Sequence, residues 1–120
     1  MYMVNHMIKV VHYTKIGTKD VDEKDAEGVK VRWLISKPDG AENFAMRLFD
    51  IKPNGHSAFH SHDWEHEVFV LEGKGIVKLE DSEKKIGKGS VVFIPSNTKH
   101  SLINKGEKKL RFLCMIPNKK

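Results

Sequence analysis

Apolar and polar residues alternate over short segments along most of the chain. Residues 29–36 (VKVRWLIS) are rich in β-branched and aromatic side chains, and the turn-forming Pro38-Asp39-Gly40 follows them. The pattern recurs at regular intervals, which is typical of the short strands of an all-β sandwich or barrel. It predicts strands over residues 8–13, 29–36, 44–51, 66–72, 76–80, 84–87, 90–94, 99–104 and 110–117.

Helix signals are scarce. The polar stretch at residues 20–27 fits either one short helical turn or a loop, and Pro53-Asn54-Gly55 predicts a turn that ends the strand at residues 44–51. The extreme ends, residues 1–6 and 118–120, are expected to be frayed.

A chain of 120 residues predicts one domain. We expect a barrel core over about residues 29–117 and an N-terminal strand or arm over about residues 1–28. The single cysteine, Cys114, excludes an intramolecular disulfide and a cysteine-rich zinc module. No apolar run approaches the roughly 20 residues of a membrane span, and no signal-peptide core is present near the N-terminus. A cytoplasmic protein that does not interact with membranes is the expectation.

The positive charge of the chain points to a solvated surface rather than to a nucleic-acid partner. The formal net charge is +5, but 18 of the 21 basic residues are Lys and only Arg32, Arg47 and Arg111 are Arg. The Lys residues are scattered and often lie beside Glu or Asp, whereas nucleic-acid binders usually concentrate basic residues on one face. We therefore expect no nucleic-acid binding.

Four of the seven histidines form a pattern that suits a metal ion. His60 and His62 are two apart, so in extended backbone both side chains point to the same side. His66 begins the next predicted strand after a bend, and His100 lies beyond Pro95, where a barrel can bring it beside the others. Neutral imidazole is the commonest metal ligand and suits Zn, Cu, Fe and Ni. A pH-sensitive cluster of polar strand residues is the alternative.

Two segments around these histidines resemble the two motifs of the cupin superfamily. Residues 54–73 (NGHSAFHSHDWEHEVFVLEG) are similar to G-x5-HxH-x3-E-x6-G, with Asn54 in the first Gly position and His66 in place of the usual glutamate ligand. Residues 89–104 (GSVVFIPSNTKHSLIN) are similar to G-x5-P-x-G-x2-H-x3-N, with Asn97 in the second Gly position. Asn tolerates left-handed backbone almost as Gly does. The chain most resembles small single-domain cupins with four histidine ligands, an assignment that the ending FLCMIP supports.

The resemblance implies a jelly-roll β-barrel, a homodimer and a divalent ion held by His60, His62, His66 and His100. Mn²⁺ or Fe²⁺ is the expected ion, with Zn, Ni, Cu and Co as alternatives. Glu67 is a rival for the third ligand position, but strand alternation places it on the face opposite His66. We therefore take His66 as the ligand.

Four neutral ligands leave the full charge of a divalent ion in the site, which favours anionic ligands and the lower oxidation state of a redox metal. They also leave coordination positions open, as in catalytic sites. The expected function is a Mn- or Fe-dependent oxidoreductase of the dioxygenase type that acts on a small organic substrate. The alternatives are a metal-dependent isomerase or epimerase for a sugar or small acid, and a non-catalytic cupin that binds a small ligand or a metal.

Two further residues are candidates for lining the pocket. Cys114 shares a strand face with Phe112, and it is either a buried small hydrophobe or a catalytic neighbour of the metal. Arg47 shares a face with apolar residues and must find a partner there. It is either an interior anion anchor or half of an ion pair at the dimer interface. Trp64 is expected to pack in the core or between subunits.

Overall fold

The computed structural model describes residues 8–118, which form strands joined by loops and two 3-10 turns. The turns η1 and η2 span Tyr13–Lys15 and Lys37–Asp39. The strands are β1 (Lys19–Asp20), β2 (Glu27–Ile35), β3 (Phe44–His56), β4 (His66–Glu72), β5 (Lys74–Lys78), β6 (Glu83–Gly87), β7 (Val91–Ile94), β8 (Ser101–Asn104) and β9 (Leu110–Pro117). The expected all-β class is confirmed.

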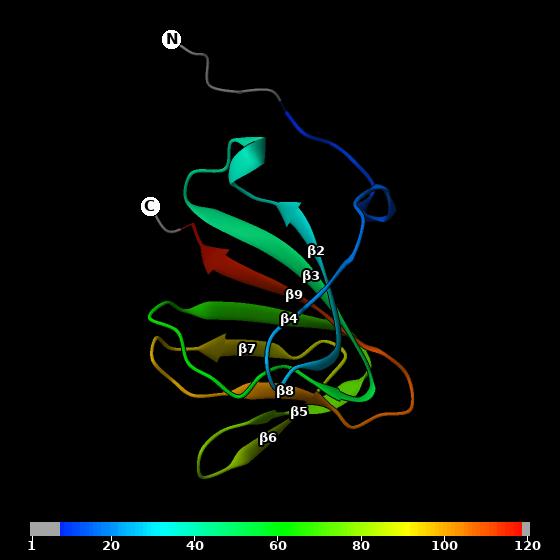
Figure 1. The fold of residues 1–120 in the computed structure, drawn as a ribbon, viewed down its shortest axis with the longest axis vertical. Coiled ribbons are helices and arrows are strands. Elements are labelled where there is room, and N and C mark those ends of the chain that lie inside the picture. Colours follow the sequence, from blue (N-terminus) through cyan, green and yellow to red (C-terminus); the bar gives the residue numbers. More distant parts are fainter. Residues whose placement is uncertain (1–7, 119–120) are drawn as a thin grey trace.

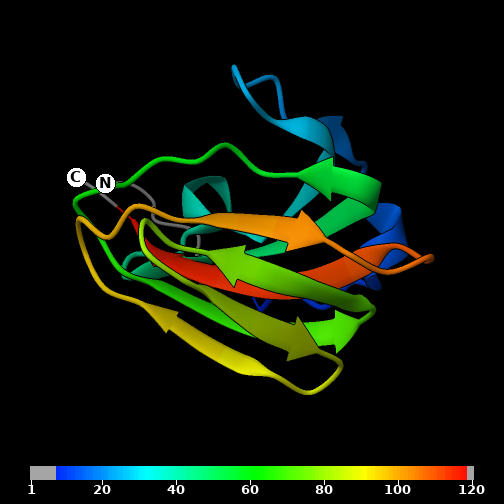
Figure 2. The same ribbon diagram turned by 90° about the horizontal axis from the view of Figure 1, so that it is seen from below.

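All the strands belong to one curled sheet. Its order is β6-β5-β8-β3-β9-β4-β7, with β2 added on β3 and β1 added on β2. Figure 1 shows the layer β2-β3-β9-β4-β7 above β8, β5 and β6, and Figure 2 shows the sheet curling around a common interior. This arrangement is the expected jelly-roll β-barrel.

The strand β3 is longer than the sequence predicts, because Pro53-Asn54-Gly55 bends it without ending it. Residues Phe44 to Ile51 pair with β9, whereas His56 pairs with Ile103 of β8 in the other layer. Asn54 takes a left-handed φ of 67° inside this bend. The bend therefore carries one strand from one layer of the barrel to the other, and it delivers the chain to the segment that contains His60 and His62.

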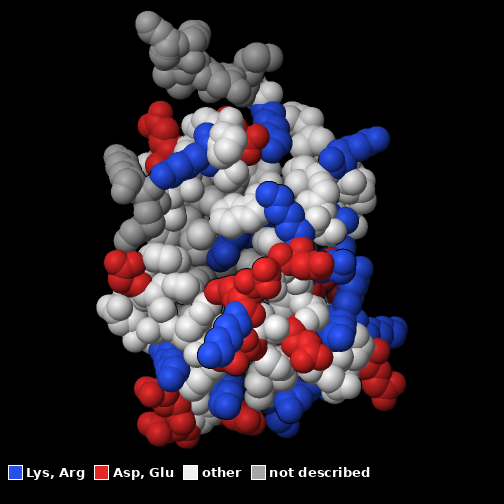
Figure 3. Space-filling model, in the orientation of Figure 1, with Lys and Arg blue, Asp and Glu red and all other residues white. Residues whose placement is uncertain are grey.

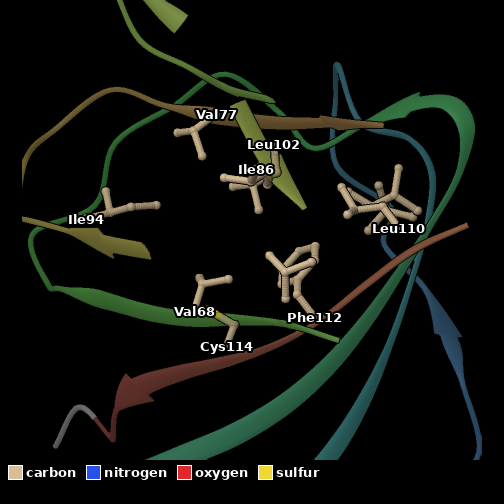
Figure 4. Close-up of a cluster of buried hydrophobic side chains, with 11 residues drawn as sticks. Val68, Val77, Ile86, Ile94, Leu102, Leu110, Phe112 and Cys114 are labelled. Carbon is tan, nitrogen blue, oxygen red and sulfur yellow. The ribbon is translucent and has the colours of Figure 1, made fainter. Parts of the chain in front are cut away.

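The interior of the barrel is apolar. Side chains of β4 and β9, among them Val68, Phe112 and Cys114, point toward residues of the opposite layer such as Val77 and Leu102 (Figure 4). The alternation that predicted strands also sets this orientation, since every second residue of a strand points inward. Several of these core residues also line the cavity at the histidine cluster, among them Val68, Leu102 and Phe112.

The N-terminal part of the described chain differs from expectation. Residues 8–12 are not a strand, and the 3-10 turn η1 follows them. The apolar Ile8 and Val10 are exposed, because this segment has no strand beside it to pair with. Residues 21–26, between β1 and β2, form a loop with Asp25 at a φ of 73°, and a loop was one of the two structures expected for residues 20–27.

Of the terminal residues that were expected to be frayed, the structure describes only Asn118. Asn118 is not frayed, since its backbone N–H donates to the Asn43 carbonyl at 3.0 Å and its side chain donates to the Ala41 carbonyl. The expected fraying of residues 1–6 and 119–120 lies outside the described residues.

An ion-pair cluster on the outside of the barrel fastens η1 to the sheet. The Arg111 guanidinium donates to both oxygens of Asp50, at 2.7 and 2.9 Å, and to the Tyr13 hydroxyl at 3.0 Å. Arg32 and Arg111 lie over the Tyr13 ring, with their guanidinium carbons 5.2 and 5.0 Å from its centroid. The aromatic ring and the charges together hold this segment against β2, β3 and β9.

Basic and acidic residues are interspersed on the face drawn in Figure 3, without a continuous basic surface. Among residues 8–118, no helix has the length and apolar character needed to cross a membrane.

Candidate metal centre

The four histidines come from three separate segments that the fold brings together. The backbones of His60 and His100 form an isolated bridge, in which each N–H donates to the other's carbonyl, at 3.2 and 3.0 Å. His66 is the first residue of β4, and it pairs with Ile94 of β7. His62 lies in the loop between them, where its carbonyl accepts from the Asn97 backbone N–H at 2.6 Å.

Both asparagines in the expected glycine positions of the motifs adopt the backbone that glycine would favour. Asn54 has a φ of 67° and Asn97 a φ of 63°. The first lies in the bend of β3, and the second holds the loop that contains His62. A residue with a branched side chain would be strained at either position, so these asparagines help to bring the histidines together.

The distances between the imidazole rings fit one shared ion. The ring centroids of the pairs His60–His62, His66–His100 and His62–His66 are 4.3, 5.0 and 5.3 Å apart, and those of His60 and His100 are 6.2 Å apart. Rings whose nitrogens lie about 2.1 Å from one ion have centroids about 4.5 Å apart as neighbours and about 6.5 Å apart across the ion. The Nε2 atoms of His60 and His62 are 3.1 Å apart, close to the roughly 3.0 Å expected for neighbouring ligands.

The arrangement is not a finished coordination shell. Among residues 8–118, no three His, Cys, Asp or Glu side chains already stand in metal-holding geometry. The support for a shared ion therefore comes from the distances between the rings. The ligand role of the four histidines stays a prediction.

A hydrogen bond orients the ring of His100, and a carboxylate faces the ring of His60. The Nδ1 atom of His100 donates to the Thr98 carbonyl at 2.8 Å, which leaves the Nε2 lone pair of His100 unprotonated. The Nδ1 atom of His60 faces a Glu23 carboxylate oxygen at 3.7 Å. Such outer partners are typical of metal-binding histidines. Among residues 8–118, the buried Nδ1 atom of His66 has no hydrogen-bond partner, which is a cost to the fold.

The surroundings of His62, His66 and His100 favour neutral imidazole, which is the form that binds metals. Burial lowers the pKa of His66 to about 3, and the charges of His100 and Arg47 add to the effect. Burial also lowers the pKa of His62, together with the charge of His60. Burial lowers the pKa of His100 as well, although the hydrogen bond to Thr98 opposes that shift.

The cluster lies at a cavity of about 430 Å³, a size that suits a small molecule. Most of its wall is apolar or aromatic, and the charged residues at its wall include Arg47, Glu23, Asp20 and Lys19. The apolar and aromatic lining consists of Val21, Val29, Val31, Trp33, Phe49, Trp64, Val68, Ile94, Leu102, Phe112 and Ile116. The same cavity is therefore lined both by apolar side chains and by the four histidines.

The two predicted pocket residues also line this cavity. Cys114 is both a core residue and part of the cavity wall, and its Sγ accepts from Arg47 Nη2 at 3.1 Å. Burial raises the pKa of the Cys114 thiol, although Arg47 opposes the shift, so the thiol is protonated at neutral pH. The catalytic role assigned to Cys114 and Arg47 stays a prediction.

Three features of the site were not anticipated. Glu23 comes from the polar loop before β2 and reaches His60, which no periodicity in that loop signals. Trp33 of β2 also lines the cavity. Trp64 does more than pack, since its ring stacks on His62 with 4.4 Å between centroids and 7° between planes. The sequence signal for this contact was the spacing, because Trp64 lies two residues after His62.

Comparison with known proteins gives both the fold and the family. The solved structure of the polyketide cyclase RemF from Streptomyces resistomycificus is similar with a TM-score of 0.89 and 36% identity, over 94% of this chain and 81% of that one. The oxalate-binding protein of Thermotoga maritima is 33% identical over 92 residues, which are 73% of this chain and 74% of that protein.

A third relative matches a smaller part. The 1-methylthio-D-xylulose 5-phosphate methylsulfurylase of Rhodospirillum rubrum is 30% identical over 71 residues, 59% of this chain and 46% of that protein. The chain spans about half the length of the first curated relatives that it matches. The model of the family described as "Cupin domain" matches residues 47–116, the part that contains all four histidines, and the chain therefore belongs to the cupin family.

Proposed function

We propose that this chain is a metal-dependent enzyme in which His60, His62, His66 and His100 hold a divalent ion, with Mn²⁺ or Fe²⁺ as the expected metal. The observation that carries the proposal is the meeting of four imidazoles at one end of a largely apolar cavity of about 430 Å³. A structural zinc site would be closed, whereas this cluster faces space for a ligand. The substrate is a small organic molecule that presents an oxygen to the ion.

A divalent ion in this position supplies a Lewis acid for a substrate oxygen. The chain's own residues do the remaining work. The Thr98 carbonyl and the Glu23 carboxylate orient the rings of His100 and His60. Val68 and Phe112 form apolar wall beside the cluster and exclude water from the substrate. Ring orientation and a dry cavity are both features that support catalysis at a metal.

The first candidate reaction is a redox-neutral rearrangement of a carbonyl compound, such as cyclisation or isomerisation. Its support is the 36% identity to a polyketide cyclase over 94% of the chain. The cavity suits such substrates, because aromatic side chains, including Trp33, Phe49 and Phe112, line it.

The second candidate is the dioxygenase reaction expected from the sequence. Its support is the donor set, since four neutral imidazoles stabilise the lower oxidation state of Fe or Mn. Among the described residues, the carboxylate nearest to these imidazoles is that of Glu23, which faces His60 Nδ1 at 3.7 Å. A third possibility, binding without turnover, is favoured by the similarity to an oxalate-binding protein.

Metal content tests the site itself. Untagged protein is purified, and its Mn, Fe, Zn, Ni, Cu and Co are measured by plasma mass spectrometry, for the wild type and for His60→Ala. We expect about one ion per chain in the wild type and a loss of most of it in the variant. The matched control is His56→Ala, because His56 contacts the Ser57 carbonyl and does not line the cavity. Equal metal content in all three proteins would refute the ligand assignment.

Metal replacement separates the reaction classes. The metal-free protein is reloaded with Fe²⁺, Mn²⁺ or Zn²⁺ and incubated with a panel of small carbonyl compounds, while oxygen uptake and product formation are followed. A redox-neutral enzyme turns over with Zn²⁺ and consumes no oxygen, whereas a dioxygenase needs Fe²⁺ or Mn²⁺ and consumes one O₂ per product. Binding without product under all conditions would support the non-catalytic alternative.

We also propose that the chain works as a homodimer. The support is an apolar surface on β4 and β7, where Phe69, Val91 and Phe93 are exposed on the outside of the barrel. Sedimentation equilibrium of the wild type and of Phe93→Lys tests this proposal. A dimer that the substitution dissociates is the expected result, and a wild-type monomer would contradict it.

A further inference from the structure

We propose that Arg47 is the anion-binding group of the cavity, and that its ligand is a small carboxylate with a flat, apolar body. The inference rests on the proposed function in one respect, namely that the same ligand extends to the histidine cluster. The geometry that carries it is a guanidinium at the wall of the cavity that has no carboxylate partner in the part of the chain that the structure describes.

Arg47 is poorly satisfied for a charged group in a barrel interior. A guanidinium has five N–H donors. Among the described residues, its one hydrogen bond goes to the Cys114 sulfur at 3.1 Å, a weak acceptor, and its Nε is buried with no partner. None of the ion pairs in this part of the chain includes Arg47. Arg47 is partly buried, and a charge that is removed from water is normally paired, because an unpaired one costs free energy.

Two aromatic rings lie against the guanidinium of Arg47. The Arg47 guanidinium carbon lies 4.8 Å from the Phe49 ring centroid and 5.4 Å from the Trp33 ring centroid. The aromatic rings provide no conventional hydrogen-bond acceptor, so the N–H donors of Arg47 remain available to an added one. A carboxylate accepts from them in two parallel N–H···O bonds, a match that a single oxygen does not provide.

The position of Arg47 favours a ligand over a partner subunit as the source of the counter-charge. Trp33, Arg47, Cys114 and Val68 lie in register across β2, β3, β9 and β4, and all four line the cavity. Arg47 thus faces the interior of the barrel, whereas a subunit contact would lie on the outside. The interior position favours the anion anchor over the interface ion pair.

The same register sets the length of the ligand. His66 lies two residues before Val68 on the same face of β4, and β4 is two strands away from β3. Two residues along a strand and two strands across a sheet separate the Cα atoms of Arg47 and His66 by about 12 Å. Both side chains point into the cavity and shorten that gap. A molecule of about one ring length with a carboxylate at one end can span it.

The lining favours a carboxylate over a phosphate. The cavity wall is mostly apolar, and its cations are Arg47 and Lys19. A phosphate ester carries more charge and three acceptor oxygens, so it needs more donors than one guanidinium edge offers. An aryl carboxylate places one charge at Arg47 and its ring against Phe112 or Val68.

The experiment measures binding of three matched probes, benzoate, benzamide and phenyl phosphate, to the metal-free and to the metal-loaded protein. The fluorescence of the two tryptophans provides the signal, since Trp33 and Trp64 both line the cavity. We expect benzoate to bind more tightly than either benzamide or phenyl phosphate, in both forms of the protein. Arg47→Met should weaken benzoate binding about 10- to 100-fold and leave benzamide binding unchanged.

Two variants keep the test decisive. Arg47→Lys retains the charge and should bind benzoate more tightly than Arg47→Met but less tightly than the wild type. The reason is that Lys lacks the two parallel N–H donors of a guanidinium. Lys52→Met removes an exposed cation whose partner is the exposed Glu27, and it should change nothing. If Arg47→Met does not fold, the comparison of benzoate with benzamide in the wild type, with Arg47→Lys beside it, still tests the proposal.

The outcomes separate this inference from the proposed function. Equal binding of benzoate and benzamide, or benzoate binding that Arg47→Met and Arg47→Lys do not change, overturns the inference. Preference for phenyl phosphate overturns the carboxylate assignment. A protein that binds no metal but retains the Arg47-dependent preference for benzoate contradicts only the proposed function. Loss of benzoate binding on removal of the metal, with no effect of Arg47→Met, contradicts only the inference.

Discussion

Two arginines on opposite faces of the same strand pair have very different surroundings. Arg111 of β9 lies on the outer face, in register with Asp50 of β3, and makes two short hydrogen bonds to that carboxylate. Arg47 of β3 lies on the inner face, in register with Cys114 of β9, and bonds only to its sulfur. The outer side chain has its counter-ion within the chain, whereas the inner one has none among residues 8–118.

The difference separates a structural charge from a functional one. On the outer face Arg111, Asp50 and Tyr13 form a network that fastens the N-terminal segment to the barrel. On the inner face a charge without a partner does not stabilise the fold, because its desolvation is not compensated. Unsatisfied groups of this kind are concentrated at functional sites, where a ligand completes them.

Removing the outer counter-ion should have the largest effect on stability. Asp50→Ala leaves the guanidinium of Arg111, which is only 10% exposed, without its main partner. We expect a loss of about 3 kcal/mol in the free energy of unfolding, measured by urea denaturation. The control is Asp20→Ala, whose exposed ion pair with Lys30 should contribute less than about 1 kcal/mol. Equal losses in both variants would contradict the assigned role of Asp50.

The same pair should give the protein an acid-sensitive component of stability. Burial alone would raise the pKa of Asp50, but the hydrogen bonds and charge of Arg111, with the charges of Lys109 and Arg32, lower it below its ordinary value. Because the pKa of Asp50 is lower in the folded state, its contribution is present above about pH 4, the unfolded value. It is lost as the pH falls through the folded value.

The measurement compares the wild type with Asp50→Asn in urea titrations between pH 7 and pH 2. The difference in unfolding free energy between the two proteins should be constant near neutral pH and should shrink in strong acid. A difference that grows as the pH falls would mean that Asp50 is not stabilised in its charged form.

Substitution of the inner arginine should act in the opposite direction. Arg47→Met replaces an unpaired charge by an apolar side chain of similar length among apolar neighbours. We expect an unchanged or higher free energy of unfolding, by up to about 1–2 kcal/mol, together with the weaker benzoate binding described above. Calorimetric melting of the metal-free protein provides the measurement. A loss of stability as large as that of Asp50→Ala would show that Arg47 is a structural residue after all.

The smallest effect is expected for substitution of Glu23, which lies in the loop between β1 and β2 and faces His60. Glu23→Gln removes a charge that faces His60 Nδ1 at 3.7 Å but lies half-exposed. We expect metal affinity to fall about 10-fold or less, at the lower end for outer partners of ligating histidines. Competition with a fluorescent chelator measures the change. The matched control is Glu27→Gln, in an exposed ion pair with Lys52, which should leave metal affinity unchanged.

Much of the fold follows from local rules in the sequence. Alternation predicts eight of the strands to within a few residues, because a strand with one buried face must repeat every two residues. The prediction was wrong at residues 8–13, where β-branched residues suggest a strand but no neighbouring strand is available to pair with them. It was also wrong about the end of β3, since a proline and a left-handed asparagine can bend a strand as well as end it.

The sequence also predicted some features of the candidate site and missed others. Spacing and motif order place His60, His62, His66 and His100 together, and strand alternation turns His66 inward and Glu67 outward; the tertiary structure agrees with both placements. The approach of Glu23 to His60 was beyond the sequence, because it depends on how a loop without periodicity folds over the barrel mouth. The stacking of Trp64 on His62 likewise depends on the path of a loop.

For Arg47 the sequence by itself determined that an arginine shares a strand face with apolar residues and needs a partner. Only the tertiary structure decided that this face is the interior of the barrel, next to the histidine cluster, because the curl of the sheet and the register of four strands determine which side is enclosed. The physical reason is that alternation specifies two faces, whereas closure of the sheet specifies which of them surrounds a cavity.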